Sequence, residues 1–276
     1  MDDPLKRGTP PGSLRDFAVT YAPPHAKPLL DALYAFEAEI DDTVRASSHE
    51  VAHTRLQWWR GEIDRLLGGN AQHPVTRALG PLRATAGTDL ALLHEALVAA
   101  DIELARLTFG SASELEAYCY RASGSLQTLA AIACAARQDL SDREREFARR
   151  LGSAVKQTEL LRDLRQHATA GRLPLALDEL DAAGVDPRDL LAEPLPPALA
   201  RLLETRRLAL RNDLQQLPAL LDPAEQRSQR QGLVLAALHA KLLERIDHRR
   251  ELARTRAEVA PSTRLWTAWR TALRHA

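Results

Sequence analysis

Apolar residues recur along this chain at the spacing of helix faces, with polar residues between them. Ala, Leu, Arg and Glu dominate the sequence, and the alternation of β-branched residues that is typical of strands is absent. The pattern predicts an all-α protein. The expected helices lie near residues 25–46, 50–68, 74–107 with a break around Gly87, 112–137, 142–169, 195–217, 223–256 and 262–274.

Several of these helices begin with capping signals. Ser111 and Ser141 each precede a Glu by three positions, as in a capping box. Asp186 and Asp222 each precede a proline, which combines a capping side chain with a Pro at the first helical position. The stretch 171–197 is the least regular interior segment. Because long loops in compact domains are usually functional, we expect this one to serve the site or cover it as a lid.

Composition then limits the size and the partners of the protein. The chain has 276 residues, of which 45% are hydrophobic, so it can bury a substantial core. We interpret residues 1–12 as a flexible N-terminus and residues 13–276 as one helical domain. Lys+Arg and Asp+Glu both number 37, so no net charge draws the chain to nucleic acid, and we expect no nucleic-acid partner.

The cysteines and the apolar runs indicate a compartment. Cys119 and Cys134 are the two cysteines, and they have neither metal-ligand spacing nor the density of a disulfide scaffold. The N-terminus shows no apolar signal-peptide core, and no apolar run approaches the ~20 residues of a membrane span. We therefore expect a cytoplasmic protein, with any membrane contact peripheral and at the inner membrane.

A first group of charged residues lies on the helix expected near 25–46. Glu37, Asp41 and Arg45 follow one another at i, i+4 and i+8, with Asp42 beside them. This spacing places the side chains on one helical face. A solvated face with internal ion pairs is one interpretation, and a carboxylate pair that holds a cation is the other.

A second group lies on the helix expected over 142–169. Glu159, Asp163 and His167 are again spaced at i, i+4 and i+8. Oxygen ligands suit Mg²⁺, whereas a His in the set favours transition metals, and a salt-bridged face is the structural alternative. Gly171-Arg172 follows, which adds a hinge and a guanidinium that matches phosphate geometry.

Several longer motifs surround these two groups in a fixed order. They are Tyr34-Ala35-Phe36 before Asp41-Asp42, Arg55-Leu56-Gln57-Trp58-Trp59-Arg60-Gly61-Glu62, His73-Pro74-Val75, Tyr118-Cys119-Tyr120-Arg121-Ala122-Ser123-Gly124-Ser125, Leu151-Gly152-Ser153-Ala154 before Leu160-Leu161-Arg162-Asp163, Gly171-Arg172 and Leu177-Asp178-Glu179-Leu180. In this order and spacing, from roughly residue 13 to 190, the chain resembles the squalene/phytoene synthase family.

The resemblance implies an isoprenoid-synthase-type helical bundle around a central cavity, where two prenyl diphosphates meet and Mg²⁺ neutralises the departing pyrophosphate. It places Asp41, Asp42 and Asp163 in catalytic positions, with Asp41 and Asp163 opposite one another at roughly 10 Å, the span of bridging metals. The metal ligands would be Asp41, Glu159, Asp163 and His167. The groups that would meet a prenyl diphosphate or a related isoprenoid lipid are Arg45, Arg60, Tyr118, Arg162 and Arg172.

The chain departs from the family pattern at both acidic motifs. Arg45 and His167 stand where the family has carboxylates, and Lys156 and Glu159 stand where it has Gln and Asn. A guanidinium in place of an anionic ligand opposes metal occupancy. We therefore expect Mg²⁺-dependent condensation to be impaired or altered. The alternative is a non-catalytic scaffold, similar to the phytoene-synthase-like assembly factors of respiratory complex I, which have also lost the acidic motifs and end in a Trp-Arg helix.

The C-terminal helix carries half of the tryptophans. Its apolar residues Leu265, Trp266, Trp269 and Leu273 form one stripe, which Arg264, Arg270 and Arg274 flank. We expect the stripe to pack on the bundle, since terminal helices usually dock in this way. The alternative is that it stays exposed and contacts a protein partner or a membrane surface.

Overall fold

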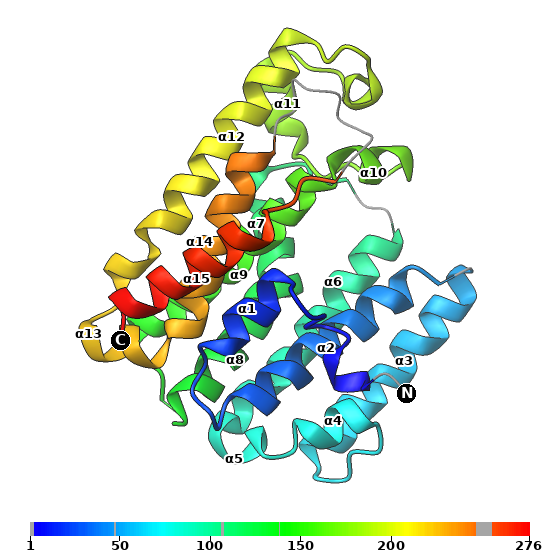
Figure 1. Ribbon diagram of the computed structural model, residues 1–276. Helices are drawn as coiled ribbons and strands as arrows, with labels where there is room; N and C mark the ends of the chain where they lie inside the picture. The colour runs from blue at the N-terminus through cyan, green and yellow to red at the C-terminus, as the bar shows by residue number, and fades with distance from the viewer. Residues whose placement is uncertain (1–2, 47, 106–107, 138, 247–255) are drawn as a thin grey trace.

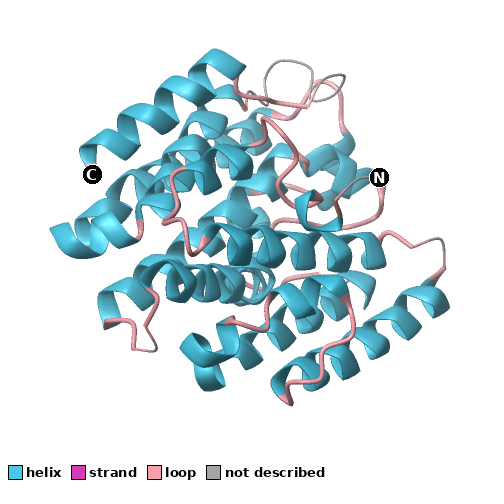
Figure 2. Cartoon of the chain, turned by 60° about the horizontal axis from the view of Figure 1, so that its bottom comes forward, coloured by secondary structure: helices cyan, strands magenta, loops and turns pink. Residues whose placement is uncertain are grey.

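The protein is helical throughout the part of the chain that a computed structural model describes, which is residues 3–46, 48–105, 108–137, 139–246 and 256–276. Within these ranges every regular element is a helix and none is a strand (Figure 2). The all-α prediction is therefore confirmed.

The helices follow the chain in Figure 1 from blue to red. The α-helices are α1 (Leu14–Thr20), α2 (Lys27–Val44), α3 (His49–Leu67), α4 (Pro74–Ala78), α5 (Leu82–Ala86), α6 (Leu93–Ala105), α7 (Ala112–Cys119), α8 (Ser125–Ala135), α9 (Asp142–Arg162), α10 (Leu164–Thr169), α11 (Leu177–Ala183), α12 (Pro197–Gln216), α13 (Pro223–Ser228), α14 (Arg230–Arg245) and α15 (Pro261–Arg274). Short turns of other helix types are η1 (Pro4–Lys6), η2 (Gly87–Leu92), η3 (Tyr120–Gly124), η4 (Pro187–Leu191) and η5 (Leu217–Leu220).

The sequence predicted most of these helices but missed their interruptions. The helix expected over 142–169 ends at Arg162, because Asp163 leaves the helical region at φ −102° and ψ 18° before α10 begins. The helix expected over 112–137 contains the π-helical turn η3. Helix α1 was not expected, and the loop expected over 171–197 contains α11 and η4. Residues 247–255 of the last long predicted helix lie outside the described residues.

The capping predictions are confirmed in three helices and corrected in a fourth. Ser141 with Glu144, Asp186 with Asp189, and Asp222 with Glu225 form reciprocal capping boxes. At α7 the Ser111 side chain caps the helix as expected. The Glu114 carboxylate, however, accepts a hydrogen bond from the backbone N–H of Gly110 rather than of Ser111. That capping box is therefore only half formed.

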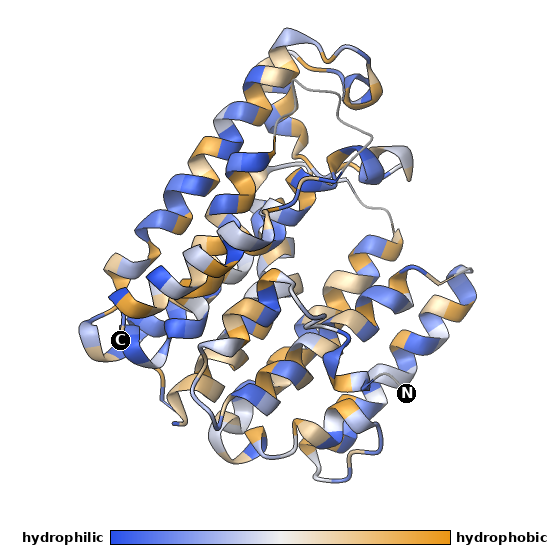
Figure 3. Cartoon of the chain, viewed as in Figure 1, coloured by the Kyte–Doolittle hydropathy of each residue, from blue (hydrophilic) through white to orange (hydrophobic). Residues whose placement is uncertain are grey.

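Buried apolar residues form two large clusters, one in each half of the chain. The first joins α2, α3 and α6 to α8, and the second joins α9, α12 and α14 to α15. The halves lie on opposite sides of α8 and α9 in Figure 1, and apolar positions alternate with polar ones along the helices in Figure 3. Between the clusters, the Tyr34 hydroxyl accepts hydrogen bonds from Gln127 at 3.1 Å and Gln231 at 2.8 Å, which ties α2 to α8 and α14.

Two glycines let α9 approach η3 at backbone contact. A Cβ on Gly152 would lie 2.4 Å from the Gly124 Cα and 2.6 Å from the Ser123 carbonyl oxygen. Only a residue without a side chain fits at such a distance. This contact fixes the position of α9 relative to η3. It therefore also fixes the positions of Lys156 and Glu159, which lie about one and two turns further along α9.

Helix α15 packs on the bundle with the opposite face to the one expected. Its buried residues are the small Thr267, Ala268 and Ala272, which dock on α14 and α1. Trp266 and Trp269 keep 57% and 44% of their surface exposed. The expectation that the aromatic stripe packs on the bundle is therefore wrong, because short side chains let the helix approach its neighbours more closely than the tryptophans would.

Candidate functional site

Charged side chains meet where the two apolar clusters adjoin, and we call this group the charged centre. It comprises Arg15 of α1, Glu37 and Asp41 of α2, Glu103 of α6, Lys156 and Glu159 of α9, and Arg172 of the loop after α10. Charges in such a place are expensive unless they are paired, so their pairing decides what the site can bind.

Arg15 links three helices within the charged centre. Its Nη2 lies 2.8 Å from Glu37 Oε1 and 3.6 Å from Glu159 Oε1. Its guanidinium carbon lies 4.9 Å from the centre of the Tyr34 ring, which adds a cation–π contact. The α1 helix thus inserts a cation between carboxylates of α2 and α9.

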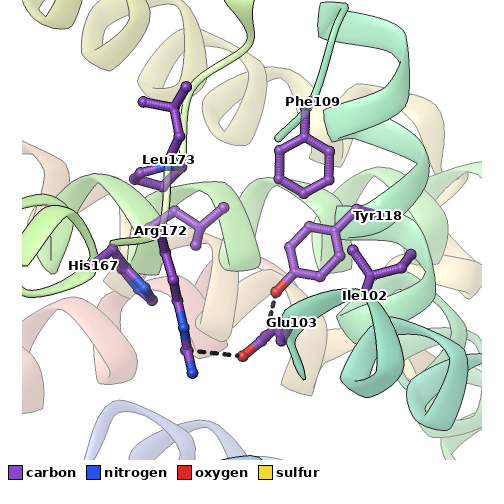
Figure 4. Close-up of a pocket in the computed structure, with 9 residues that line it drawn as sticks. Ile102, Glu103, Phe109, Tyr118, His167, Arg172 and Leu173 are labelled. Atoms are coloured by element: carbon purple, nitrogen blue, oxygen red, sulfur yellow. Dashed lines mark hydrogen bonds and ion pairs between the residues drawn. The ribbon is translucent and has the colours of Figure 1, made fainter. Parts of the chain in front are cut away.

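Glu103 is the second focus of the charged centre (Figure 4). Its carboxylate lies 3.3 Å from Lys156 Nζ and 3.3 Å from Arg172 Nη1, and the Tyr118 hydroxyl donates a hydrogen bond to it. Burial acts to raise its pKa, but the charge of Lys156 and the hydrogen bond from Tyr118 outweigh burial and lower the pKa to about 2. Glu103 is therefore a fully paired carboxylate.

Glu37 and Asp41 are less well compensated. Burial, together with the nearby charges of Glu159 and Asp41, raises the pKa of Glu37 to about 7 against the pull of Arg15. Its Oε2 is buried and accepts no hydrogen bond from any described residue. Burial also raises the pKa of Asp41, which Lys156 opposes. The α2 side of the centre thus holds more negative charge than its surroundings neutralise.

Three small pockets surround Glu103. The first holds about 30 Å³ and is lined mainly by apolar groups that include Phe109, Leu160 and Leu173. The second, with Asp41 and Lys156, holds about 20 Å³, and the third, beside His49 and Arg172, about 130 Å³. Since one water needs roughly 10–15 Å³, the first pocket has room for about two or three waters and the second for about one or two. A long prenyl chain would require the side chains around them to move.

The first acidic motif is divided between the centre and the surface. Asp41 faces Lys156 across the second pocket. Asp42 pairs with Arg7 on the outside, and Arg45 contacts both aspartates at 3.3 Å while 65% of its side chain is exposed. Arg45 thus lies at the surface, where it pairs with both aspartates of the motif.

The second acidic motif is divided by the helix break at Asp163. This carboxylate accepts hydrogen bonds from two guanidinium groups, that of Arg162 at 2.7 and 3.0 Å and that of Arg256 at 2.7 and 2.9 Å. Burial would raise its pKa, but these hydrogen bonds lower it to about 2. Glu159 faces Arg15, and His167 lines the first pocket beside Arg172. The three members of the predicted ladder therefore have three different sets of partners.

The remaining predicted substrate groups are also separated. Tyr118 and Arg172 meet at Glu103, in the first pocket. Arg60 instead pairs with Asp101 and ties α3 to α6, and it lines none of the three pockets. The proposed span of roughly 10 Å between Asp41 and Asp163 stays a prediction.

The side chains, as they are arranged in this structure, do not form a set of ligands for Mg²⁺. No three His, Cys, Asp or Glu side chains of the described residues come together in a way that could hold a metal ion. Arg15, Lys156, Arg162 and Arg256 already supply the positive charge that metal ions would bring to these carboxylates. Internal cations thus pair with these carboxylates.

Sequence reasoning missed Arg15 and Glu103. Glu103 carried a detectable signal, because it continues the buried stripe Ala96, Ala99 and Ala100 at helical spacing and thus puts a charge on an apolar face. Arg15 carried none, since only the docking of α1 brings it to Glu37, 22 residues away in sequence.

One further motif has a metal-binding spacing. His49-Glu50-x-x-His53 matches the helical pattern of zinc proteases, and the two imidazole rings lie 5.8 Å apart on α3. Such a centre needs a third protein ligand, and the described residues supply none. Among the described residues the motif therefore has only two of the three protein ligands that such a centre needs.

The fold is that of an isoprenoid-synthase-type helical protein. A dehydrosqualene synthase solved with a ligand superposes with a TM-score of 0.79 at 18% identity, covering 99% of both chains. The squalene synthase HpnC from Alicyclobacillus acidocaldarius superposes with a TM-score of 0.66 at 19% identity, covering 80% of this chain and 86% of that one. At these identities the likeness concerns the fold.

Sequence comparison identifies the family. Residues 14–266 match the family model described as squalene/phytoene synthase, and the chain belongs to this family. The phytoene synthase of Mycobacterium tuberculosis (strain ATCC 25618 / H37Rv) is 28% identical over 170 residues, which are 61% of this chain and 55% of that protein. The phytoene synthase of Arthrospira platensis is 29% identical over 146 residues, 49% and 47% of the two chains. The matches thus span about half the length of these relatives.

Proposed function

We propose that this chain is a squalene/phytoene synthase-like protein of isoprenoid metabolism that binds a prenyl diphosphate, with Mg²⁺-dependent condensation of two such molecules impaired. The observation that carries the proposal is the pairing of Asp163 with both Arg162 and Arg256. A carboxylate that two guanidinium groups hold in this way has to be released before it can bind a metal.

Lys156 and Arg172 supply the positive charge for a diphosphate in this proposal. Both contact Glu103 at 3.3 Å. A diphosphate that enters the third pocket would compete with this carboxylate for Arg172, while Lys156 lines the second pocket, which Glu103 also lines. The prenyl chain would follow the apolar lining of the first pocket, past Phe109 and Leu173. The loop after Gly171, which carries Arg172, would move to admit it.

Binding and turnover test this proposal separately. Calorimetric titration with farnesyl or geranylgeranyl diphosphate in EDTA should show binding that weakens in Arg172→Ala. Incubation of the same compounds with Mg²⁺ should give little or no product. Robust Mg²⁺-dependent formation of a squalene- or phytoene-type product would overturn the impairment, and absence of binding with and without Mg²⁺ would overturn the ligand assignment.

Restoring the ligands tests the reason for the impairment. Arg45→Asp with His167→Asp should improve Mg²⁺ binding, and adding Arg256→Ala should improve it further because Asp163 then loses one guanidinium. Arg45→Ala with His167→Ala is the matched control, since it removes the same side chains without adding carboxylates. Equal Mg²⁺ affinity of the two double variants would contradict the account.

The second candidate is a non-catalytic scaffold like the phytoene-synthase-like assembly factors of complex I. The same neutralised motifs favour it, because a scaffold needs no metal. The exposed face of α15 would then be the partner surface. Deletion of the gene separates the candidates: loss of assembled complex I with unchanged isoprenoid lipids supports the scaffold, and the reverse supports the first proposal.

A further inference from the structure

The outer face of α15 exposes more large apolar side chains than any other described helix. Leu265, Trp266, Trp269 and Leu273 are 58%, 57%, 44% and 56% exposed. The two indole rings lie 5.0 Å apart and tilt by 37°, so they form one continuous aromatic surface. We call these four residues the α15 stripe. From Leu265 to Leu273 it covers eight helical steps, about 12 Å.

The stripe lies beside positive charge. Helix α15 contains Arg264, Arg270 and Arg274 and no Asp or Glu, whereas the whole chain has equal numbers of acidic and basic residues. Arg264 turns inward, where it donates hydrogen bonds to the carbonyls of Val259 and Gly12. Arg270, which directly follows Trp269, and Arg274, one turn further along, are exposed. The outer surface of the helix is therefore aromatic and cationic.

The size of the stripe limits what can cover it. With each Trp presenting about 150–250 Å² when fully accessible, four half-exposed side chains offer on the order of 400 Å². A stable protein interface needs about 800 Å² per partner. The other large exposed apolar residues, such as Trp58, Leu191 and Leu208, lie on other elements, α3, η4 and α12. The area is too small for a stable dimer through this face alone.

We propose that the α15 stripe docks the protein on an anionic phospholipid surface. Indole rings favour the interface between headgroups and acyl chains, and Leu side chains add apolar burial there. Arg270 and Arg274 supply attraction to anionic headgroups. No helix of the described residues is long and apolar enough to cross a bilayer, so the contact is peripheral. This inference is independent of whether condensation occurs.

The helix can be altered without disturbing its packing. Thr267, Ala268 and Ala272 make the buried face, so replacements on the outer face leave the docking on α14 and α1 intact. Trp266→Ser with Trp269→Ser removes the aromatic surface. Arg270→Glu with Arg274→Glu keeps the tryptophans and reverses the charge. Trp58→Ser is the matched control, since Trp58 is 45% exposed on α3, away from the stripe.

Flotation with vesicles tests the proposal. The native chain should bind vesicles of phosphatidylcholine with phosphatidylglycerol, more weakly in high salt and more weakly with phosphatidylcholine alone. Each stripe double variant should bind at least about tenfold more weakly. Trp58→Ser should bind as the native chain does, and urea unfolding should show that all variants are folded.

Three outcomes would overturn the proposal. The first is no binding of the native chain to anionic vesicles at low salt. The second is equal binding to both vesicle types, which would remove the role of the arginines. The third is a concentration-dependent dimer in sedimentation equilibrium that Trp266→Ser with Trp269→Ser abolishes, which would assign the stripe to a second copy of the chain.

Discussion

At the scale of single residues, the charged centre consists of buried groups whose charges are only partly neutralised by their neighbours. Arg15 pairs with Glu37 and Glu159 at once, so one guanidinium serves two carboxylates. The pKa of Glu37 rises to about 7 and that of Glu159 falls, because Arg15 and Lys156 stabilise the charge of Glu159 despite its burial. The two carboxylates therefore compete for the same cations, and Glu37 is the one that holds a proton more readily.

The raised pKa of Glu37 makes stability depend on pH. Between its ordinary value of 4.5 and about 7, the folded chain binds a proton that the unfolded chain has lost. This contribution is fully present below about pH 4.5, and it is lost as pH rises through about 7. Glu37→Gln, which mimics the protonated acid, should differ from the native chain by less than about 1 kcal/mol near pH 5. At pH 8 it should be more stable by up to about 3 kcal/mol.

Urea unfolding of both proteins at pH 5 and pH 8 measures this difference. Glu244→Gln is a suitable control, because Glu244 is a surface residue that pairs with Lys241. Its stability difference from the native chain should be small at both pH values. A Glu37→Gln variant that is less stable than the native chain at pH 8 would show that the ion pair with Arg15 outweighs burial.

At the scale of helices, the contact between α9 and η3 sets the position of the site. Gly152→Ala would bring a Cβ to 2.4 Å from the Gly124 Cα, and backbone cannot rotate away as a side chain can. We expect this variant to lose about 1–3 kcal/mol or more, or to fail to fold. Thermal unfolding monitored by circular dichroism provides the measurement.

Gly61→Ala is the matched control on α3. Its added Cβ would meet nothing closer than the Arg65 guanidinium at 3.6 Å. Ala is the better helix former, so this change should stabilise the protein by about 0.5–1 kcal/mol. If both variants unfolded like the native chain, the close approach of α9 to η3 would not be a structural requirement.

At the scale of the whole molecule, the two apolar clusters share helices and are linked by the hydrogen bonds of Tyr34 between them. Helix α1 gives Val19 to the first cluster and Ala18 to the second, and α9 gives Ala148 to the first and Phe147 to the second. Tyr34 is hydrogen-bonded to helices from both halves. Neither half can unfold alone without losing the contacts that these shared helices make with the other half. We therefore expect one cooperative unfolding transition.

Two probes test this expectation. In a Trp266→Phe, Trp269→Phe background, fluorescence reports on Trp58 and on Trp59, which is buried in the first cluster. Far-ultraviolet circular dichroism reports on all helices. Coincident urea transitions would support one domain over residues 13–276, whereas an earlier fluorescence transition would indicate that the halves unfold separately.

The sequence by itself determined the helical class, most helix starts and the family. These properties depend on local spacing: a capping box such as Ser141 with Glu144 spans one turn, and the apolar period needs only neighbouring turns. The family motifs added the order of Asp41 and Asp163 along the chain. All of these are readable without knowing which segments meet.

Only the tertiary structure decided which charges meet and which face of α15 is buried. Arg15 reaches Glu37 because α1 docks on the bundle, and Arg256 reaches Asp163 across 93 residues. The spacing of apolar residues in α15 indicates an apolar stripe, but the residues that are buried are Ala268 and Ala272. Their small side chains permit a closer approach to α14 and α1. Long-range pairing and the competition between two faces of a helix are properties of contacts between distant segments, so the local pattern of the chain leaves them open.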